Sequence, residues 1–72
     1  MINKSQVVLY MYDRLIRRKV IRTNDILNQY DISLRTFQRY IAEINDFFFN
    51  NFINCSVVYN YEDKYYYLKD ER

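Results

Sequence analysis

The 72-residue sequence predicts a small α+β domain in which three helices are followed by a two-stranded β-hairpin. Apolar residues recur at helical spacing up to about residue 49 and alternate at strand spacing after Phe52. Half of the residues are hydrophobic and 19% are aromatic, which argues against disorder and supplies large side chains for a core. At this length we expect one domain over residues 1–72.

The first helix is predicted over residues 4–18, with Ser5 as its cap. The Arg17-Arg18-Lys19 end suits the negative C-terminal end of a helix dipole, and it equally suits contact with a polyanion. The residues at helical spacing are Val8, Met11, Tyr12 and Leu15.

A connector, Val20-Ile21-Arg22, follows, and we expect it to pair with the later hairpin. Thr23 is predicted to cap a second helix over 24–30, and Asp31-Ile32 to form a tight turn. Two short helices joined by such a turn are typical of a helix-turn-helix. The inward-facing residues of the second helix are Ile26, Leu27 and Tyr30.

The third helix is predicted from Ser33, whose hydroxyl suits the cap position, to about residue 49. Arg35, Gln38 and Arg39 lie off its apolar stripe, and its first two turns contain no carboxylate. Such a surface suits a helix in the DNA major groove, because guanidinium and amide groups can bond to base edges and arginine also neutralises phosphates. The stripe consists of Phe37, Ile41, Ile44 and Phe48.

The hairpin is predicted from two alternating runs around a polar turn at Tyr61-Glu62-Asp63. Tyr66 and Leu68 share one face of the second run, over 64–69, and Cys55 starts the first as a small apolar filler. Three helices followed by such a hairpin form a winged helix-turn-helix.

The segment Ile32-Ser33-Leu34-Arg35-Thr36-Phe37-Gln38-Arg39-Tyr40-Ile41 resembles the recognition-helix signature of DeoR-type and WYL-domain transcriptional regulators. Tyr40 replaces the aspartate usual in that family, and Ile44 its usual leucine. The hairpin keeps the family's Tyr66 and Leu68 without the preceding glycine. The resemblance covers roughly Ser5 to Leu68.

The resemblance implies a sequence-specific regulator of a bacterium, phage or plasmid that binds double-stranded DNA, with Ser33, Arg35, Thr36 and Arg39 at the interface. Members of this family usually carry a ligand-sensing domain after the wing. We therefore expect either the DNA-binding part of a longer regulator or a complete small one, and no small-molecule ligand in this domain.

The net charge of +2 is uneven, because residues 14–39 hold seven cations against two aspartates. This asymmetry favours polyanion binding, although a charge run is often only a solvated face. Gln38 is either an adenine-reading amide or a polar filler, and Thr23 either a cap or a backbone contact. Lys64 could reach a phosphate, whereas Glu62 and Asp63 beside it favour a structural wing. The predicted DNA-binding residues are Arg17, Arg18, Arg22, Thr23, Ser33, Arg35, Thr36, Gln38, Arg39 and Lys64.

The chain has no histidine, no glycine and a single cysteine. A zinc site, Ser-His or Cys-His catalysis and a glycine-rich phosphate loop are therefore not expected, and we predict no enzyme, no metal and no cofactor. The longest apolar run, Val7 to Tyr12, is too short for a membrane span. No signal peptide is evident, so a cytoplasmic protein without membrane contact is expected.

One alternative from another class is a winged helix that binds protein, in which the basic face meets an acidic partner. The pattern Arg35-Thr36 with Arg39 favours DNA. Phe47, Phe48 and Phe49 cannot all face one side of a helix, so some of them lie against the hairpin, in a dimer contact or exposed to solvent. Our hypothesis is that they promote self-association, and a homodimer could form through this region or through a missing C-terminal domain.

Overall fold

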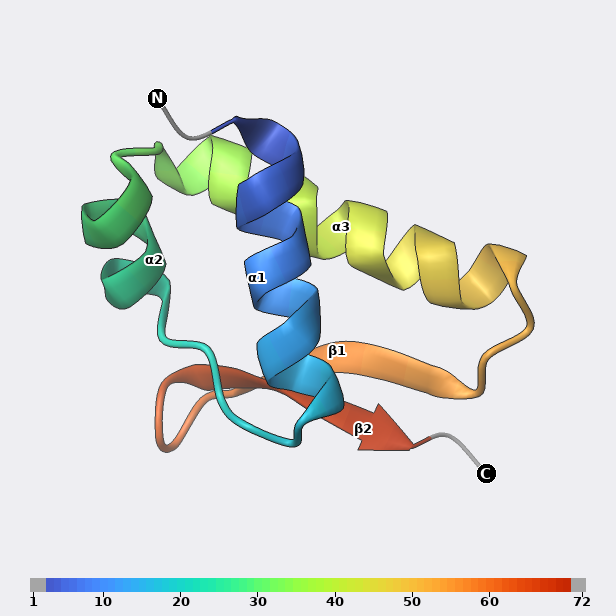
Figure 1. Cartoon of the computed structure of the whole chain (residues 1–72). Coiled ribbons are helices and arrows are strands. Elements are labelled where there is room, and N and C mark those ends of the chain that lie inside the picture. The colour runs from blue at the N-terminus through green and yellow to red at the C-terminus, as the bar shows by residue number, and fades with distance from the viewer. Residues whose placement is uncertain (1–2, 71–72) are drawn as a thin grey trace.

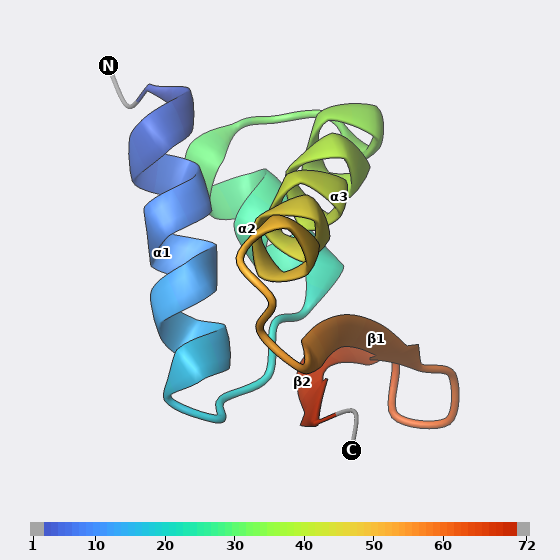
Figure 2. The same cartoon turned by 90° about the vertical axis from the view of Figure 1, so that its right-hand side faces the viewer.

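The computed structural model describes residues 3–70 and has the predicted α+β order (Figure 1). Three helices are followed by an antiparallel two-stranded sheet. In Figure 1, α1 crosses in front of α3, and the hairpin lies below α3 at the level of the lower end of α1, while Figure 2 shows α3 nearly end-on beside α1. The elements are α1 (Lys4–Ile16), α2 (Thr23–Tyr30), α3 (Leu34–Asn50), β1 (Cys55–Asn60) and β2 (Tyr65–Asp70).

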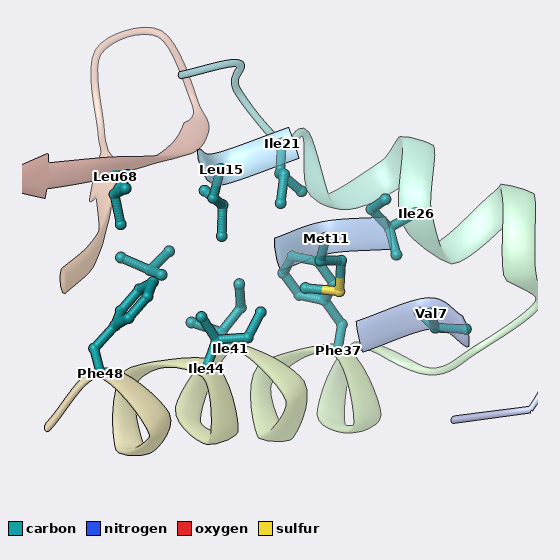
Figure 3. Packing of buried hydrophobic residues seen from close by; sticks show 11 residues of the cluster. Val7, Met11, Leu15, Ile21, Ile26, Phe37, Ile41, Ile44, Phe48 and Leu68 are labelled. Atoms are coloured by element: carbon teal, nitrogen blue, oxygen red, sulfur yellow. The ribbon is translucent and has the colours of Figure 1, made fainter. Parts of the chain in front are cut away.

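The core is built around α3, whose predicted apolar stripe is fully confirmed (Figure 3). Every other element adds buried side chains to this stripe, and no polar residue among 3–70 is buried. Burying one such large side chain contributes about 1.5–3 kcal/mol, so this core as a whole is the main source of stability for so short a chain. The buried residues are Val7, Met11, Leu15, Ile21, Ile26, Phe37, Ile41, Ile44, Phe48, Val57 and Leu68.

The start of α3 is also as predicted. The Ser33 hydroxyl accepts a hydrogen bond from the Thr36 N–H at 3.1 Å. At its other end, the Ile53 N–H donates to the Phe48 carbonyl and the Phe52 N–H to the Phe49 carbonyl. This is a Schellman motif, and it holds Phe52 in the left-handed region at φ 57° where glycine is usual.

Two predicted details of α1 are wrong. Asn3, not Ser5, is its cap, because the Asn3 Oδ1 accepts from the Gln6 N–H at 3.0 Å. The helix ends at Ile16 rather than residue 18, because Arg18 turns left-handed at φ 62° and the chain reverses there. The buried face runs through Val7, Met11 and Leu15, with Val8 and Tyr12 packed at its margin.

The predicted cap of α2 is also wrong. Thr23 is the first helical residue, and Arg22 occupies the cap position without a side-chain bond. The cause is the preceding pairing: Ile21 bridges Tyr66, which keeps the chain extended through Arg22 and sets where the helix can begin. The Ile21 N–H donates to the Tyr66 carbonyl at 2.9 Å and the Tyr66 N–H to the Ile21 carbonyl at 2.8 Å, confirming the predicted pairing of the connector.

The hairpin places Val57 opposite Leu68 and Tyr59 opposite Tyr66. Val57 and Leu68 are buried against the helices, and Tyr66 packs beside them. β2 begins one residue later than predicted, because Lys64 belongs to the turn at φ 59°. Cys55 is half-buried against the core, and its thiol donates to the Asp70 carboxylate at 3.2 Å.

The Asn45 side chain joins α3 to the outer edge of β1. Its Oδ1 accepts from the Val57 N–H at 2.7 Å, and its Nδ2 donates to the Val57 carbonyl at 3.4 Å. One amide thus satisfies both backbone groups of a buried residue and blocks the strand edge there against further pairing.

Replacing Asn45 with alanine should lower the free energy of unfolding by about 1–3 kcal/mol, because the Val57 backbone groups lose their partners. Urea denaturation measures the change. Asn50→Ala is the matched control, since Asn50 is also in α3 but exposed, and we expect it to alter stability by less than about 0.5 kcal/mol. Equal stability of the two variants would show that the hydrogen bonds between the Asn45 side chain and the Val57 backbone do not stabilise the fold.

Tyr66 lies in an aromatic cluster between the hairpin and α3. Its ring centroid is 5.4 Å from that of Phe37 and 4.8 Å from that of Tyr59. Burial raises the pKa of Tyr66 above the usual 10.0, and Tyr59 and Tyr61 raise it further. The neutral phenol is therefore favoured in the folded state.

Because the pKa of Tyr66 is higher folded than unfolded, its contribution to stability is present below pH 10 and is lost as the pH rises through the folded pKa. Unfolding midpoints measured between pH 8 and about 11 should fall at the alkaline end. Tyr66→Phe should make this fall shallower. An identical pH profile for the variant would contradict the role of Tyr66.

Candidate nucleic-acid interface

The side of α3 turned away from the core carries Arg35, Gln38 and Arg39, all three exposed. The buried stripe fixes this orientation, because residues three or four apart share a helix face and the stripe points inward. The predicted group is therefore brought together on one accessible surface, which we call the α3 basic face and define by these three residues.

Most arginines elsewhere in residues 3–70 are engaged by the protein itself. Each of these guanidinium groups is fixed by a carboxylate or a backbone carbonyl, which reduces its freedom to bind a ligand. The pairs are Arg14 with the Val20 carbonyl at 2.9 Å, Arg17 with Asp13 at 2.9 Å, Arg18 with Asp70 at 3.0 Å and Arg22 with the Asp63 carbonyl at 3.2 Å.

Arg35 and Arg39 differ from those four, because neither forms an ion pair or hydrogen bond within the described part of the chain. The nearest acid along the helix, Glu43, is taken by Lys4 at 2.8 Å. Two positive charges thus stand one helical turn apart with no counter-charge from the protein.

This arrangement is unfavourable for the isolated helix. Arg35 lies in the first turn, where the helix dipole is positive and where α3 has no acidic residue. Arg35 and Arg39 are four residues apart, a spacing at which like charges destabilise a helix by about 0.2–0.5 kcal/mol. The dipole and both side chains concentrate positive potential at the same end of α3.

Ser33 and Thr36 border this end of the helix. The Ser33 hydroxyl both accepts from the Thr36 N–H and donates to Thr36 Oγ1 at 3.0 Å, so its hydrogen-bonding capacity is largely used within the cap. The Thr36 hydroxyl accepts in this pair, which leaves its own proton free to donate outward. The first turn also has backbone N–H groups without helical partners, which favour an anion.

A second group of predicted residues lies in a groove of about 430 Å³ between the start of α2 and the hairpin turn. Arg22, Thr23 and Lys64 meet here, although their positions in the sequence are far apart. The Arg22 guanidinium also lies 5.6 Å from the centre of the Tyr65 ring, which fixes it on the hairpin. Asp25 lines the same groove, so its charge is mixed.

Arg17 and Arg18 stand apart from both groups, at the C-terminal end of α1. The Arg17–Asp13 pair has the i, i+4 spacing that the sequence itself displays. The Arg18–Asp70 pair joins residues 52 positions apart, fastening the end of α1 to the end of β2. No local pattern indicates that second pair.

The three consecutive phenylalanines point in different directions. Phe48 is 1% exposed and belongs to the core, so the expectation that it takes part in a dimer contact is wrong. The Phe47 ring is half-exposed and packs edge-on against Tyr12, with 5.8 Å between ring centroids. Phe49 is exposed.

No family model matches this chain, and neither a curated protein nor a solved structure matches it. Within residues 3–70, none of the helices has the length and apolar character needed to cross a membrane.

The substitution Arg35→Glu should raise the free energy of unfolding by about 0.5–1.5 kcal/mol, because it places an acid at the positive end of the dipole and removes the repulsion of Arg39. Thermal unfolding at low salt measures this gain, which should shrink at high salt. Arg35→Gln serves as the control, because it removes the repulsion of Arg39 without adding an acid and should give a smaller gain. A loss of stability in Arg35→Glu would mean that Arg35 has a structural partner.

Proposed function

We propose that this chain is a winged helix-turn-helix domain that binds double-stranded DNA, with α3 entering the major groove. In this proposal α2 and α3 form the helix-turn-helix, joined through Asp31-Ile32-Ser33, and β1 and β2 form the wing. The order of elements and the exposure of the α3 basic face support the assignment.

The observation that carries the proposal is the contrast among the arginines. Among residues 3–70, four arginines are engaged by the protein, whereas Arg35 and Arg39 have no partner and lie on the exposed side of α3, at the positive end of its dipole. The repulsion between Arg35 and Arg39 and the position of Arg35 at the positive end of the dipole both destabilise the free helix. Bound phosphate groups would be attracted by the two arginines and by the dipole, so this arrangement favours a polyanionic ligand.

Each side chain of the α3 basic face has a chemical role in this complex. The guanidinium groups of Arg35 and Arg39 can bond to guanine O6 and N7 or to a phosphate, and the Gln38 amide can bond to adenine N6 and N7. The free proton of the Thr36 hydroxyl suits a phosphate oxygen at the helix start.

Arg22, Thr23 and Lys64 would contact the flanking backbone from the groove beside α2. Glu62 and Asp63, exposed in the hairpin turn, would repel DNA, so the wing acts mainly as a structural support in this proposal. Arg17 and Arg18 remain at the periphery, because their charges are already paired.

The resemblance of Ile32–Ile41 to DeoR-type and WYL-domain regulators supports a role in transcriptional regulation. The resemblance and the charge pattern are separate arguments. The first rests on residue identities in one segment, the second on which cations in residues 3–70 have partners.

Fluorescence anisotropy with random-sequence duplex DNA tests the proposal. The affinity should fall log-linearly with salt concentration. Arg39→Ala should lose about 1–3 kcal/mol of binding free energy. Arg17→Ala is the matched control, and we expect it to bind nearly as well as the parent chain because the Arg17 charge is already paired.

Absence of binding at low salt would contradict DNA binding and favour the alternative, in which the same face meets an acidic protein. Unchanged affinity in a folded Arg39→Ala variant would remove Arg39 from the interface.

A further inference from the structure

Helix α1 has two apolar stripes, and only one of them faces the core. Val7, Met11 and Leu15 are buried. Leu9 and Ile16 lie on a different side of the helix and are 64% and 45% exposed. Together with Tyr12, they follow the i, i+3, i+7 spacing of a second helix-packing surface.

This second stripe borders a groove between α1 and α3. The groove has a volume of about 250 Å³ and is lined by apolar side chains except at Glu43: Val8, Leu9, Tyr12, Ile44 and Phe47. Leu9 forms part of this lining and still projects into solvent, and Phe47 on the α3 side is 46% exposed. A projecting side chain and a groove on the same surface are what a two-fold symmetric contact requires, because each copy must supply both.

The charges at the rim favour a second copy over a charged partner. Glu43, the charged residue in the groove lining, is paired with Lys4 at 2.8 Å. Further along α1, Asp13 is paired with Arg17 at 2.9 Å. Each of these pairs is neutral. Nucleic acid or an acidic peptide would find no net counter-charge here, whereas two copies of the chain would bring together balanced rims without repulsion.

We propose that this surface, the α1–α3 face defined by Val8, Leu9, Tyr12, Ile16 and Phe47, is a homodimer interface. The two α1 helices run antiparallel across a two-fold axis, and Leu9 of each copy enters the groove of the other. Leu9 and Phe47 are the anchors, because they combine large apolar area with exposure.

The α1–α3 face does not overlap the α3 basic face. At 3.6 residues per turn, Glu43 and Phe47 lie about a quarter of a turn around α3 from Arg35 and Arg39. A dimer would therefore leave both basic faces accessible. The dimer proposal does not rest on DNA binding.

The chain supplies a matched control. Phe49 is 79% exposed, more than Leu9, but it lines a different groove, between the end of α3 and β1, together with Phe52, Ile53 and several polar residues. If exposed hydrophobic area alone caused association, a charge at Phe49 would disrupt it as strongly as one at Leu9.

Analytical ultracentrifugation from about 10 µM to 1 mM, without DNA, tests the proposal. The parent chain should shift from monomer toward dimer. Leu9→Glu should raise the dimer dissociation constant at least about tenfold, because the interface would bury an unpaired carboxylate. Ile16→Glu should act in the same direction, and Phe49→Glu should change the constant less than about twofold.

Circular dichroism confirms that each variant is folded. A parent chain that stays monomeric throughout, or a Phe49→Glu variant as disrupted as Leu9→Glu, would overturn the assignment of this face.

Discussion

The apolar stripe on α3 is the constraint on which the rest of the structure depends. Phe37 and Phe48, at its two ends, are among the largest fully buried side chains, and α1, α2, the connector and the hairpin all pack against this helix. The stripe also decides what the opposite side of α3 presents. Any rotation of the helix that exposed Phe37 would bury Arg35 or Arg39. The same orientation of α3 therefore buries the core residues and exposes the α3 basic face.

Cations have two different uses in this small domain. Arg14, Arg18 and Arg22 bond to groups outside α1 and α2 and tie connector and hairpin to the helices, much as buried residues do in larger proteins. Arg35 and Arg39 contribute nothing of this kind. Residues that destabilise a helix locally without a gain in packing are commonly the functional ones. Here Arg35 and Arg39 are such residues, and both lie on the α3 basic face.

Much of the fold was predictable because its signals are local. The α3 stripe, the Ser33 cap and the alternation of β1 all follow from residue types a few positions apart. The connector was expected to pair with the hairpin, but Tyr66 was not identified as its partner. Side-chain contacts between distant positions were not predictable, as with Asn45 to Val57 and Arg18 to Asp70. The same limit applies to the candidate site. The sequence shows where cations are dense, but only the fold shows which of them already have partners, and this separates Arg39 from Arg17.

The turns of this domain form without glycine. Arg18, Asp31, Phe52 and Lys64 all adopt left-handed backbone conformations, each of which strains a residue that has a Cβ atom by about 1 kcal/mol. The same Cβ atoms restrict the unfolded chain, which therefore has less conformational entropy to lose when it folds. The chain also lacks proline, so its refolding has no slow phase from prolyl isomerisation. The absence of glycine thus strains the native turns but reduces the number of conformations open to the unfolded chain. The absence of proline simplifies the kinetics of folding.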